Sequence, residues 1–204
     1  MLNNTSVRRA VSGAVDPVAR GLLRMHVSPD AVTLVGTLGT SVAALWFFPR
    51  QQWALGVVVI LLFVFSDLLD GTMARMSGRS GPWGAFLDST LDRFADAAIF
   101  SGLVLWFVGR GDDRLTAMLA LACLVLGSIV PYARARAEGL GMTAAVGIAE
   151  RADRLFAVLL AAFLVGLGLS PRVLTVMLAL LAVASAVTVV QRMATVRRQA
   201  GVTA

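Results

Sequence analysis

Four aspartates are spaced so that they could bind metal ions together. Asp67 and Asp70 are three residues apart, and Asp88 and Asp92 are four apart, so each pair shares one face of a helix. A turn over residues 78–82 would bring the two faces together near one end of a helical bundle. Four carboxylates that point at one another need compensating positive charge, which divalent cations supply.

The composition places these helices in a membrane. Of the 204 residues, 58% are hydrophobic and 15% are charged, and the mean hydropathy is +0.81. Soluble domains are typically about 45–50% apolar and about 25% charged. This excludes a soluble globular protein and a disordered one. The net charge of +6 reflects arginines at the ends of apolar segments, so we expect no nucleic-acid partner, and the single cysteine, Cys123, excludes a disulfide scaffold.

The apolar segments predict an all-α integral membrane protein with one domain over residues 1–204. We expect residues 29–198 to form a bundle of six transmembrane helices, since six spans of about 20 residues match the apolar content. Ser28, Pro29 and Asp30 are typical of a helix start, with an N-cap, a proline at the first position and an acid in the first turn. The expected spans cover residues 31–48, 53–75, 84–108, 115–137, 153–169 and 171–196.

Residues 1–28 carry a basic amphipathic pattern that predicts a segment lying along the membrane surface. Pro17 interrupts the pattern, so we expect two short helices, the second of them capped by Asp16. A disordered, solvated N-terminus is the alternative.

The arginines predict the orientation of the chain in the membrane. Of the 18 basic residues, 14 fall on the side that holds both termini and the connections between spans 2 and 3 and spans 4 and 5. The positive-inside rule places that side in the cytoplasm. Both termini and the cavity that holds the aspartates should therefore face the cytoplasm. The opposite side carries Arg50, Arg110, Arg114 and Arg172.

The cost of burying the four carboxylates indicates how they are compensated. One aspartate at the centre of a membrane helix costs about 2.5–3.5 kcal/mol, so four would cost about 10–14 kcal/mol if deep and unpaired. Arg75 and Arg93 are too few to offset this cost, whereas two divalent cations would balance the four charges. Oxygen ligands without histidine or cysteine favour Mg²⁺, Mn²⁺ or Ca²⁺ over zinc.

Two small residues follow the first pair of aspartates. Gly71 comes directly after Asp70, and Ala74 lies about one turn further along the same face. A glycine inside a helix costs about 1 kcal/mol relative to alanine, so its presence needs a reason. A bare backbone here would let a phosphate or ribose approach the metal ions, and close packing against a neighbouring helix is the alternative.

Together these residues resemble the signature of the CDP-alcohol phosphotransferase family. The signature is Asp-x2-Asp-Gly-x2-Ala-Arg-x8-Gly-x3-Asp-x3-Asp, and every fixed position is matched within 26 residues. The resemblance implies six transmembrane helices around a polar cavity open to the cytoplasm, usually in a homodimer. It also implies transfer of a phosphoalcohol group from a CDP-linked donor to an acceptor hydroxyl, with release of CMP. The matching residues are Asp67, Asp70, Gly71, Ala74, Arg75, Gly84, Asp88 and Asp92.

The resemblance also implies a role for each position. Asp67, Asp70 and Asp88 would ligate two Mg²⁺ ions, with Mn²⁺ as an alternative. Asp92 would both contact metal and act as the general base that takes the proton of the acceptor hydroxyl. The CDP part of the donor, CDP-diacylglycerol, would be held by Gly71, Ala74 and Arg75. The start of the first span looks like the segment that approaches the nucleotide, through Pro29, Asp30 and Thr33. Asp30 and Thr33 fit a plain helix start equally well.

A cluster of arginines predicts that the acceptor carries a phosphate. Arg134 and Arg136 end the fourth span, Arg151 and Arg154 open the fifth, and Arg192 lies near the end of the sixth. All five should face the cytoplasmic cavity or its rim, where several guanidinium groups together can bind a phosphate. Anchoring at the positive side of the membrane is the alternative. The helix dipole disfavours cations at a helix N-terminus, which argues against pure anchoring at the start of the fifth span.

The stretches that hold these arginines resemble the prokaryotic phosphatidylinositol phosphate synthases. The resemblance implies an enzyme of the bacterial inner membrane that transfers the phosphatidyl group to a myo-inositol phosphate, with Arg134, Arg154 and Arg192 at the acceptor phosphate. Relatives often have lysine at the position of Arg134, which keeps the charge but shifts the geometry. A phosphatidylglycerophosphate synthase, which uses glycerol 3-phosphate, is the nearest alternative. Asp96, Arg136 and Arg151 receive no role.

A cation transporter would also explain carboxylates inside a membrane. A transport path needs polar residues through the full thickness of the membrane, whereas the four aspartates gather on one side and the outer halves of the spans are almost wholly apolar. A non-catalytic scaffold would leave the cost of the carboxylates unexplained. The sequence therefore favours the enzyme.

Overall fold

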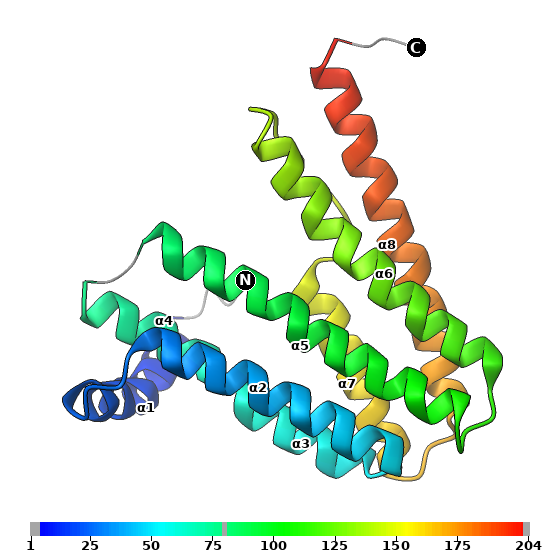
Figure 1. Cartoon of the computed structure of the whole chain (residues 1–204), viewed down its shortest axis with the longest axis horizontal. Helices are drawn as coiled ribbons and strands as arrows, with labels where there is room; N and C mark the ends of the chain where they lie inside the picture. Colours follow the sequence, from blue (N-terminus) through cyan, green and yellow to red (C-terminus); the bar gives the residue numbers. More distant parts are fainter. Residues whose placement is uncertain (1–4, 79–80, 202–204) are drawn as a thin grey trace. The chain divides into compact units, whose positions relative to one another are not determined.

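Every regular element in the described part of the chain is helical, as the sequence predicts (Figure 1). The computed structural model describes residues 5–78 and 81–201, and the side chains of residues 5–14 and of Asp67 also lie outside the described part. A single 3-10 turn, η1 (Phe48–Arg50), follows the second helix. The α-helices are α1 (Thr5–Arg24), α2 (Pro29–Phe47), α3 (Trp53–Val64), α4 (Ser66–Met76), α5 (Pro82–Val108), α6 (Arg114–Glu138), α7 (Arg151–Gly166) and α8 (Arg172–Gln199).

The start of α2 follows the local signals in the sequence. The Ser28 hydroxyl accepts the Ala31 N–H at 3.1 Å, Pro29 is the first helical residue, and Asp30 lies in the first turn. The serine satisfies an N–H that has no partner within the helix, and the acid faces the positive end of the helix dipole. The predicted start is therefore confirmed.

The prediction of two short N-terminal helices is wrong, because α1 is one helix that runs through Pro17. Proline removes one backbone hydrogen bond from a helix. However, α1 packs against α4, and Ala19 is fully buried. Tertiary packing outweighs the local break, so Asp16 lies inside a helix and does not cap one.

The predicted second span is interrupted at Phe65, which separates α3 from α4. At this point the Ser66 hydroxyl donates to the Phe63 carbonyl at 2.5 Å, a local bond that competes with the regular helix pattern. α2 lies so close that a Cβ on Gly36 would overlap the Ser66 hydroxyl. The span expected over residues 53–75 is therefore built from two helices, and the break between them lies directly before the first pair of aspartates.

Four segments of the described chain are long and apolar enough to cross a membrane. α5 has the length, but its first half carries Asp88, Asp92 and Asp96, and α7 has only 16 residues. The membrane prediction is supported by these four segments, and transmembrane placement of α5 and α7 stays a prediction. The four segments are Pro29–Arg50, Trp53–Met76, Arg114–Glu138 and Arg172–Gln199.

The described chain divides into two compact units. The first holds the residues up to Ala43 together with Val58–Ala95, and the second holds Ala44–Val57 and the residues from Asp96 onward. In the first unit, α2 lies close to the α3–α4 region, because Gly36 and Gly39 have no side chains. The prediction of a single domain over the whole chain stays a prediction.

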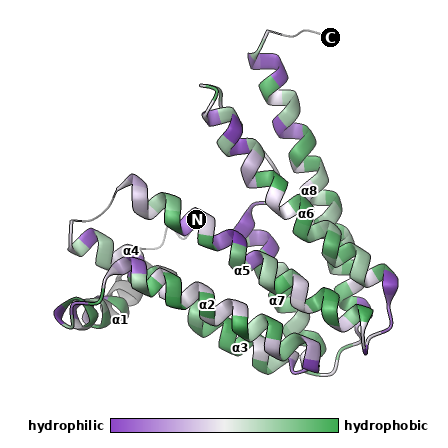
Figure 2. Cartoon of the chain, viewed as in Figure 1, coloured by the Kyte–Doolittle hydropathy of each residue, from purple (hydrophilic) through white to green (hydrophobic). Residues whose placement is uncertain are grey.

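In the second unit, α8 packs against both α6 and α7. The connections from α2 to α3, from α5 to α6 and from α7 to α8 lie at one end of this unit (Figure 1). The C-terminal ends of α6 and α8, with the start of α7, are rich in hydrophilic residues, whereas the middles of α6 and α8 are hydrophobic (Figure 2). The arginine groups that the sequence assigns to opposite membrane sides thus fall at different ends of α6 and α8.

Candidate active site

Asp70 is deeply buried and is oriented by a hydroxyl from another helix. It lies in α4 with 8% of its surface exposed. The Thr33 hydroxyl lies 2.6 Å from Asp70 Oδ2 and 3.1 Å from the Pro29 carbonyl oxygen. The carboxylate is the closer acceptor and the stronger one, because hydrogen bonds to ionised groups are short and strong. Thr33 therefore contacts a predicted metal ligand in addition to belonging to the first turns of α2.

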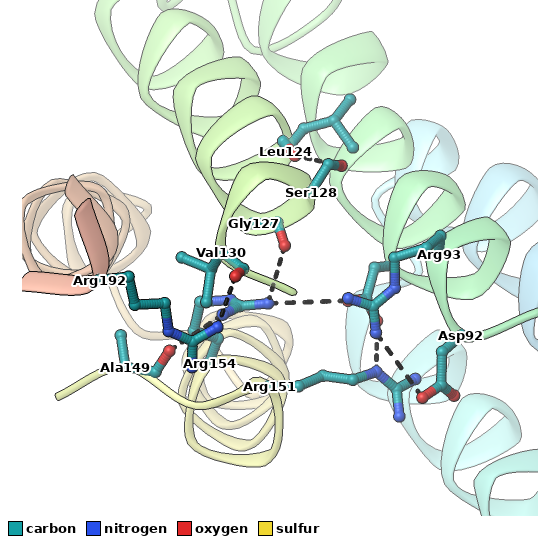
Figure 3. Close-up of polar contacts among 11 residues, drawn as sticks. Asp92, Arg93, Leu124, Gly127, Ser128, Val130, Ala149, Arg151, Arg154 and Arg192 are labelled. Carbon is teal, nitrogen blue, oxygen red and sulfur yellow. Dashed lines mark hydrogen bonds and ion pairs between the residues drawn. The ribbon is translucent and has the colours of Figure 1, made fainter. Parts of the chain in front are cut away.

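The remaining predicted metal ligands lie on α4 and α5. Asp88 is exposed, and Asp92 is half-buried with its Oδ2 3.7 Å from Arg93 Nη2 (Figure 3). The side chain of Asp67 lies outside the described residues. Among the side chains that the structure does describe, no three acidic groups lie close enough together to hold a metal ion. Convergence of all four aspartates, which includes Asp67, stays a prediction.

The donor chemistry of these residues fits a hard divalent cation. The predicted ligands are all carboxylates, and oxygen ligands suit Mg²⁺ and Mn²⁺. Metal-binding side chains are usually oriented by an outer hydrogen bond, and the Thr33–Asp70 contact is of this kind. The residues present are therefore compatible with the predicted ions.

The space around Gly71 distinguishes between room for a ligand and close helix packing, and Gly84, the glycine of the second half of the signature, can be examined in the same way. A Cβ on Gly71 would meet only the Arg75 guanidinium, at 3.5 Å, and a Cβ on Gly84 would meet no described atom within 4 Å. Gly36 differs, because a Cβ there would overlap Ser66. Neither Gly71 nor Gly84 is needed for close helix packing in the described structure, which favours the explanation that they leave room for a ligand.

The predicted nucleotide-binding residues all belong to the first unit. Arg75 is exposed at the end of α4, and its Nη2 donates to Thr72 Oγ1 at 2.9 Å. Ala74 is half-buried beside it. Asp30 Oδ2 accepts a hydrogen bond from Trp83 Nε1 at 2.9 Å, which joins the start of α2 to the start of α5. Asp30 and Thr33 thus tie α2 to the two helices that carry the aspartates.

The predicted acceptor arginines all belong to the second unit but differ in their surroundings. Arg134 is exposed and pairs with Glu138 at 2.9 Å across one turn of α6. Arg192 is 5% exposed and lies within electrostatic range of Arg134, Glu138 and Glu150. A groove of about 280 Å³ beside Arg192 is also lined by Arg136. The structure therefore brings Arg134 and Arg192 into one charged region at the polar ends of α6 and α8.

Arg154 is 2% exposed and sits in a network of ion pairs and carbonyl groups (Figure 3). Its Nη2 lies 3.9 Å from Asp96 Oδ2, and the Arg151 Nε donates to Asp96 Oδ1 at 3.1 Å. Its Nη1 donates to the Ala149 carbonyl at 3.1 Å, and its Nη2 donates to the Gly127 carbonyl at 3.2 Å. Arg154 thus binds the backbone of two elements as well as Asp96.

Pro131 explains why a buried arginine is needed at Gly127. In a regular α-helix, the N–H of residue 131 would donate to the carbonyl of residue 127, but proline has no N–H. A buried carbonyl without a donor is costly. Arg154 supplies a donor to that carbonyl, so it has a structural task in addition to its predicted contact with the acceptor.

Comparison with known proteins identifies the family. Residues 26–190 match the family model of the CDP-alcohol phosphatidyltransferases. The matched stretch includes the four aspartates and extends through both units. The chain belongs to the CDP-alcohol phosphatidyltransferase family. The resemblance of its signature residues is therefore confirmed at the level of the family.

This phosphatidyltransferase is similar to bacterial phosphatidylinositol phosphate synthases over most of its length. It is 47% identical to that of Streptomyces avermitilis, over 96% of this chain and 83% of the relative. It is 50% identical to that of Cutibacterium acnes, over 90% of this chain and 92% of the relative. It is 41% identical to that of Mycobacterium tuberculosis, over 93% of this chain and 88% of the relative.

Crystal structures of the Mycobacterium tuberculosis phosphatidylinositol phosphate synthase have a similar fold. The structure with CDP-DAG bound has a TM-score of 0.85 and 42% identity, and the match covers 89% of this chain and 92% of that one. The structure in complex with manganese and citrate also has a TM-score of 0.85 and 42% identity, and the match covers 88% of this chain and 87% of that one. The phosphatidyltransferase fold of this chain thus has solved counterparts with a CDP-linked lipid and with a divalent metal.

Two contacts around the candidate site were not predicted from the sequence. Asp96 pairs with Arg151 and Arg154, and its spacing of four from Asp92 is the one signal that places it on the same helical face. Trp83 binds Asp30, and no local pattern indicates that contact. Both contacts join residues more than 50 positions apart, so they depend on the fold.

Proposed function

We propose that this phosphatidyltransferase is a phosphatidylinositol phosphate synthase. It transfers the phosphatidyl group of CDP-diacylglycerol to a hydroxyl of a myo-inositol phosphate, giving phosphatidylinositol phosphate and CMP in phospholipid biosynthesis. The observation that carries the proposal is 41–50% identity, over at least nine-tenths of this chain, to relatives that all bear this name. The solved synthase with CDP-DAG bound supports the donor.

The donor is assigned to the first unit. Gly71, Ala74 and Arg75 hold the CDP part, with Pro29 and Asp30 at the start of α2 close to the nucleotide. Asp67, Asp70, Asp88 and Asp92 are the ligands for two Mg²⁺ ions, which Mn²⁺ can replace. The manganese in a solved relative supports a divalent metal. Bound there, the metal supplies positive charge that stabilises the negative charge developing on the departing CMP.

Asp92 and the arginines act on the acceptor. Asp92 accepts the proton of the attacking hydroxyl as its oxygen forms a bond to the lipid-side phosphorus, and the bond from that phosphorus to the CMP oxygen breaks. Arg134, Arg154 and Arg192 bind the acceptor phosphate, since guanidinium groups match phosphate oxygens in charge and geometry. The shared electrostatic surroundings of Arg134 and Arg192, at the polar ends of α6 and α8, support this role.

The enzyme is assigned to the bacterial inner membrane, with six spans and with both termini and the active site on the cytoplasmic side. The excess of arginine at the ends that hold the termini supports this orientation. We further assign the enzyme as a homodimer, which rests on the resemblance of its signature to the family. Membrane lipid surrounds α2, α3, α6 and α8, whose outer faces expose large apolar side chains.

Acceptor choice tests the proposal. The purified enzyme, with CDP-diacylglycerol and Mg²⁺, is offered inositol phosphate, free inositol and glycerol 3-phosphate in separate reactions, and CMP release is measured. We expect turnover with inositol phosphate and little with free inositol, since the arginines need a phosphate to bind. Turnover with glycerol 3-phosphate alone would identify a phosphatidylglycerophosphate synthase instead.

A further inference from the structure

Residues 143–149, here called the α6–α7 loop, are held in place by side chains of α8. The Gln199 amide binds both backbone groups of Thr143, donating to its carbonyl at 2.6 Å and accepting its N–H at 2.9 Å. The Thr188 hydroxyl accepts the N–H groups of Ile148 and Ala149, both at 3.1 Å. Buried backbone groups need partners, and a loop without secondary structure must find them elsewhere. One face of α8 provides them for both ends of this loop.

The same loop is bound by two of the arginines that we assign to the acceptor. Arg192 Nε donates to the Val146 carbonyl at 2.9 Å, and Arg154 Nη1 donates to the Ala149 carbonyl at 3.1 Å. Each of these guanidinium groups also binds a carbonyl of α6. The loop carbonyls therefore help to determine how both guanidinium groups are oriented.

Thr188 also packs directly against the backbone of the loop at Gly147. It is fully buried, and its methyl group occupies the place where a Cβ on residue 147 would lie. Gly147 has a φ of +143°, a conformation that other residues rarely adopt, so glycine is needed there for two reasons. The loop is thus pressed against Thr188 at the residues directly before α7.

We propose that Thr188 is a positioning residue for the acceptor phosphate. Thr188 fixes Ile148 and Ala149, the Ala149 carbonyl binds Arg154, and the loop backbone three residues earlier binds Arg192. Without the Thr188 hydroxyl, the loop carbonyls lose their fixed positions, and both guanidinium groups lose part of their orientation. The inference rests on the proposed function, because it concerns the binding of a phosphate-bearing acceptor.

Thr188→Val tests this role, because valine keeps the methyl group and removes the hydroxyl. The full enzyme in detergent or nanodiscs is assayed with CDP-diacylglycerol, Mg²⁺ and inositol phosphate. We expect the KM for inositol phosphate to rise roughly tenfold, which corresponds to the loss of one well-placed hydrogen bond, with an unchanged KM for CDP-diacylglycerol. Hydrogen exchange at Ile148 and Ala149 should become faster. Thr188→Ser, which keeps the hydroxyl, should have the wild-type KM for inositol phosphate and the wild-type rate of hydrogen exchange at Ile148 and Ala149.

Thr195→Val is the matched control. The Thr195 hydroxyl donates to the Gln191 carbonyl at 2.9 Å, just as Thr188 donates to the Ala184 carbonyl at 2.8 Å, but it does not bind the loop. It should behave as the wild type. If Thr188→Val fails to fold, Gln199→Leu removes the anchor at Thr143 from an exposed position and should raise the acceptor KM to a smaller degree.

Three results would overturn the proposal. These are an unchanged acceptor KM despite faster exchange of the loop, an equal rise in both KM values, and the same defect in Thr195→Val. If the wild type does not turn over inositol phosphate at all, the proposed function fails instead. The exchange data would still report whether Thr188 holds the loop, so the two failures can be told apart.

Discussion

Thr33 illustrates what a single contact adds at the scale of the residue. In the sequence it fits a nucleotide contact and a helix start equally well. In the structure its hydroxyl binds the buried Asp70 at 2.6 Å, across 37 residues of chain. No local pattern could pair these two residues, because the contact depends on how α2 packs against α4. The contact gives Thr33 a third role, as the group that orients a proposed metal ligand.

Thr33→Val should weaken metal-dependent activity, because Asp70 loses the hydrogen bond that orients it. Loss of such an outer contact typically costs about 10–100-fold in metal affinity or activity. We expect the Mg²⁺ concentration for half-maximal CMP release to rise within that range, and Thr33→Ser to remain close to the wild type. An unchanged Mg²⁺ dependence in Thr33→Val would show that the contact does not serve the metal site.

At the scale of the element, helix ends are predicted well where local chemistry sets them. The Ser28 cap places the start of α2, and the expected ends of the fourth span lie within one residue of those of α6. The continuity of α1 through Pro17 and the break at Phe65 were not predictable from local signals. Both depend on packing between elements distant in the sequence, of α1 against α4 and of α2 against Ser66.

Pro131 and Arg154 form a pair that can be tested in α6. Arg154→Ala should destabilise the protein by about 3 kcal/mol, because it leaves the Gly127 and Ala149 carbonyls without the guanidinium and removes one partner of Asp96. Pro131→Ala supplies an N–H for the Gly127 carbonyl. It should therefore stabilise Arg154→Ala more than it stabilises the wild type, with a coupling of about 0.5–3 kcal/mol. The coupling is measured by unfolding the wild type, the two single variants and the double variant in detergent. Strictly additive effects on the free energy of unfolding would contradict the pairing.

The start of α6 should be sensitive to acid. Hydrogen bonds from the Thr116 hydroxyl and backbone N–H lower the pKa of Asp113, the N-cap residue. A lowered pKa in the folded state means that the carboxylate contributes stability above its unfolded pKa of about 3.9, and that this is lost as pH falls through the folded pKa. Asp113→Ala should cost about 1 kcal/mol at pH 7, and the difference in Tm from the wild type should shrink below about pH 4. A constant difference down to pH 2 would contradict this.

At the scale of the whole molecule, the sequence predicts the fold class and the enzyme family better than it predicts the contacts between helices. Hydropathy predicts an all-helical membrane protein, and the eight signature positions predict the family, because both depend on residue type and spacing. The surroundings of Arg154 and Arg192 could not be predicted in this way. Their hydrogen bonds to Gly127, Ala149, Val130 and Val146 arise only when α6, α7 and α8 pack together.

The central claim is that Asp67, Asp70, Asp88 and Asp92 hold two divalent cations at the site of transfer. The most direct test is an anomalous difference map from crystals of this enzyme grown with Mn²⁺. We expect two peaks about 3.5–4 Å apart, each within bonding distance of these carboxylates. A map without peaks at the four aspartates, or with the manganese bound only elsewhere, would contradict the claim.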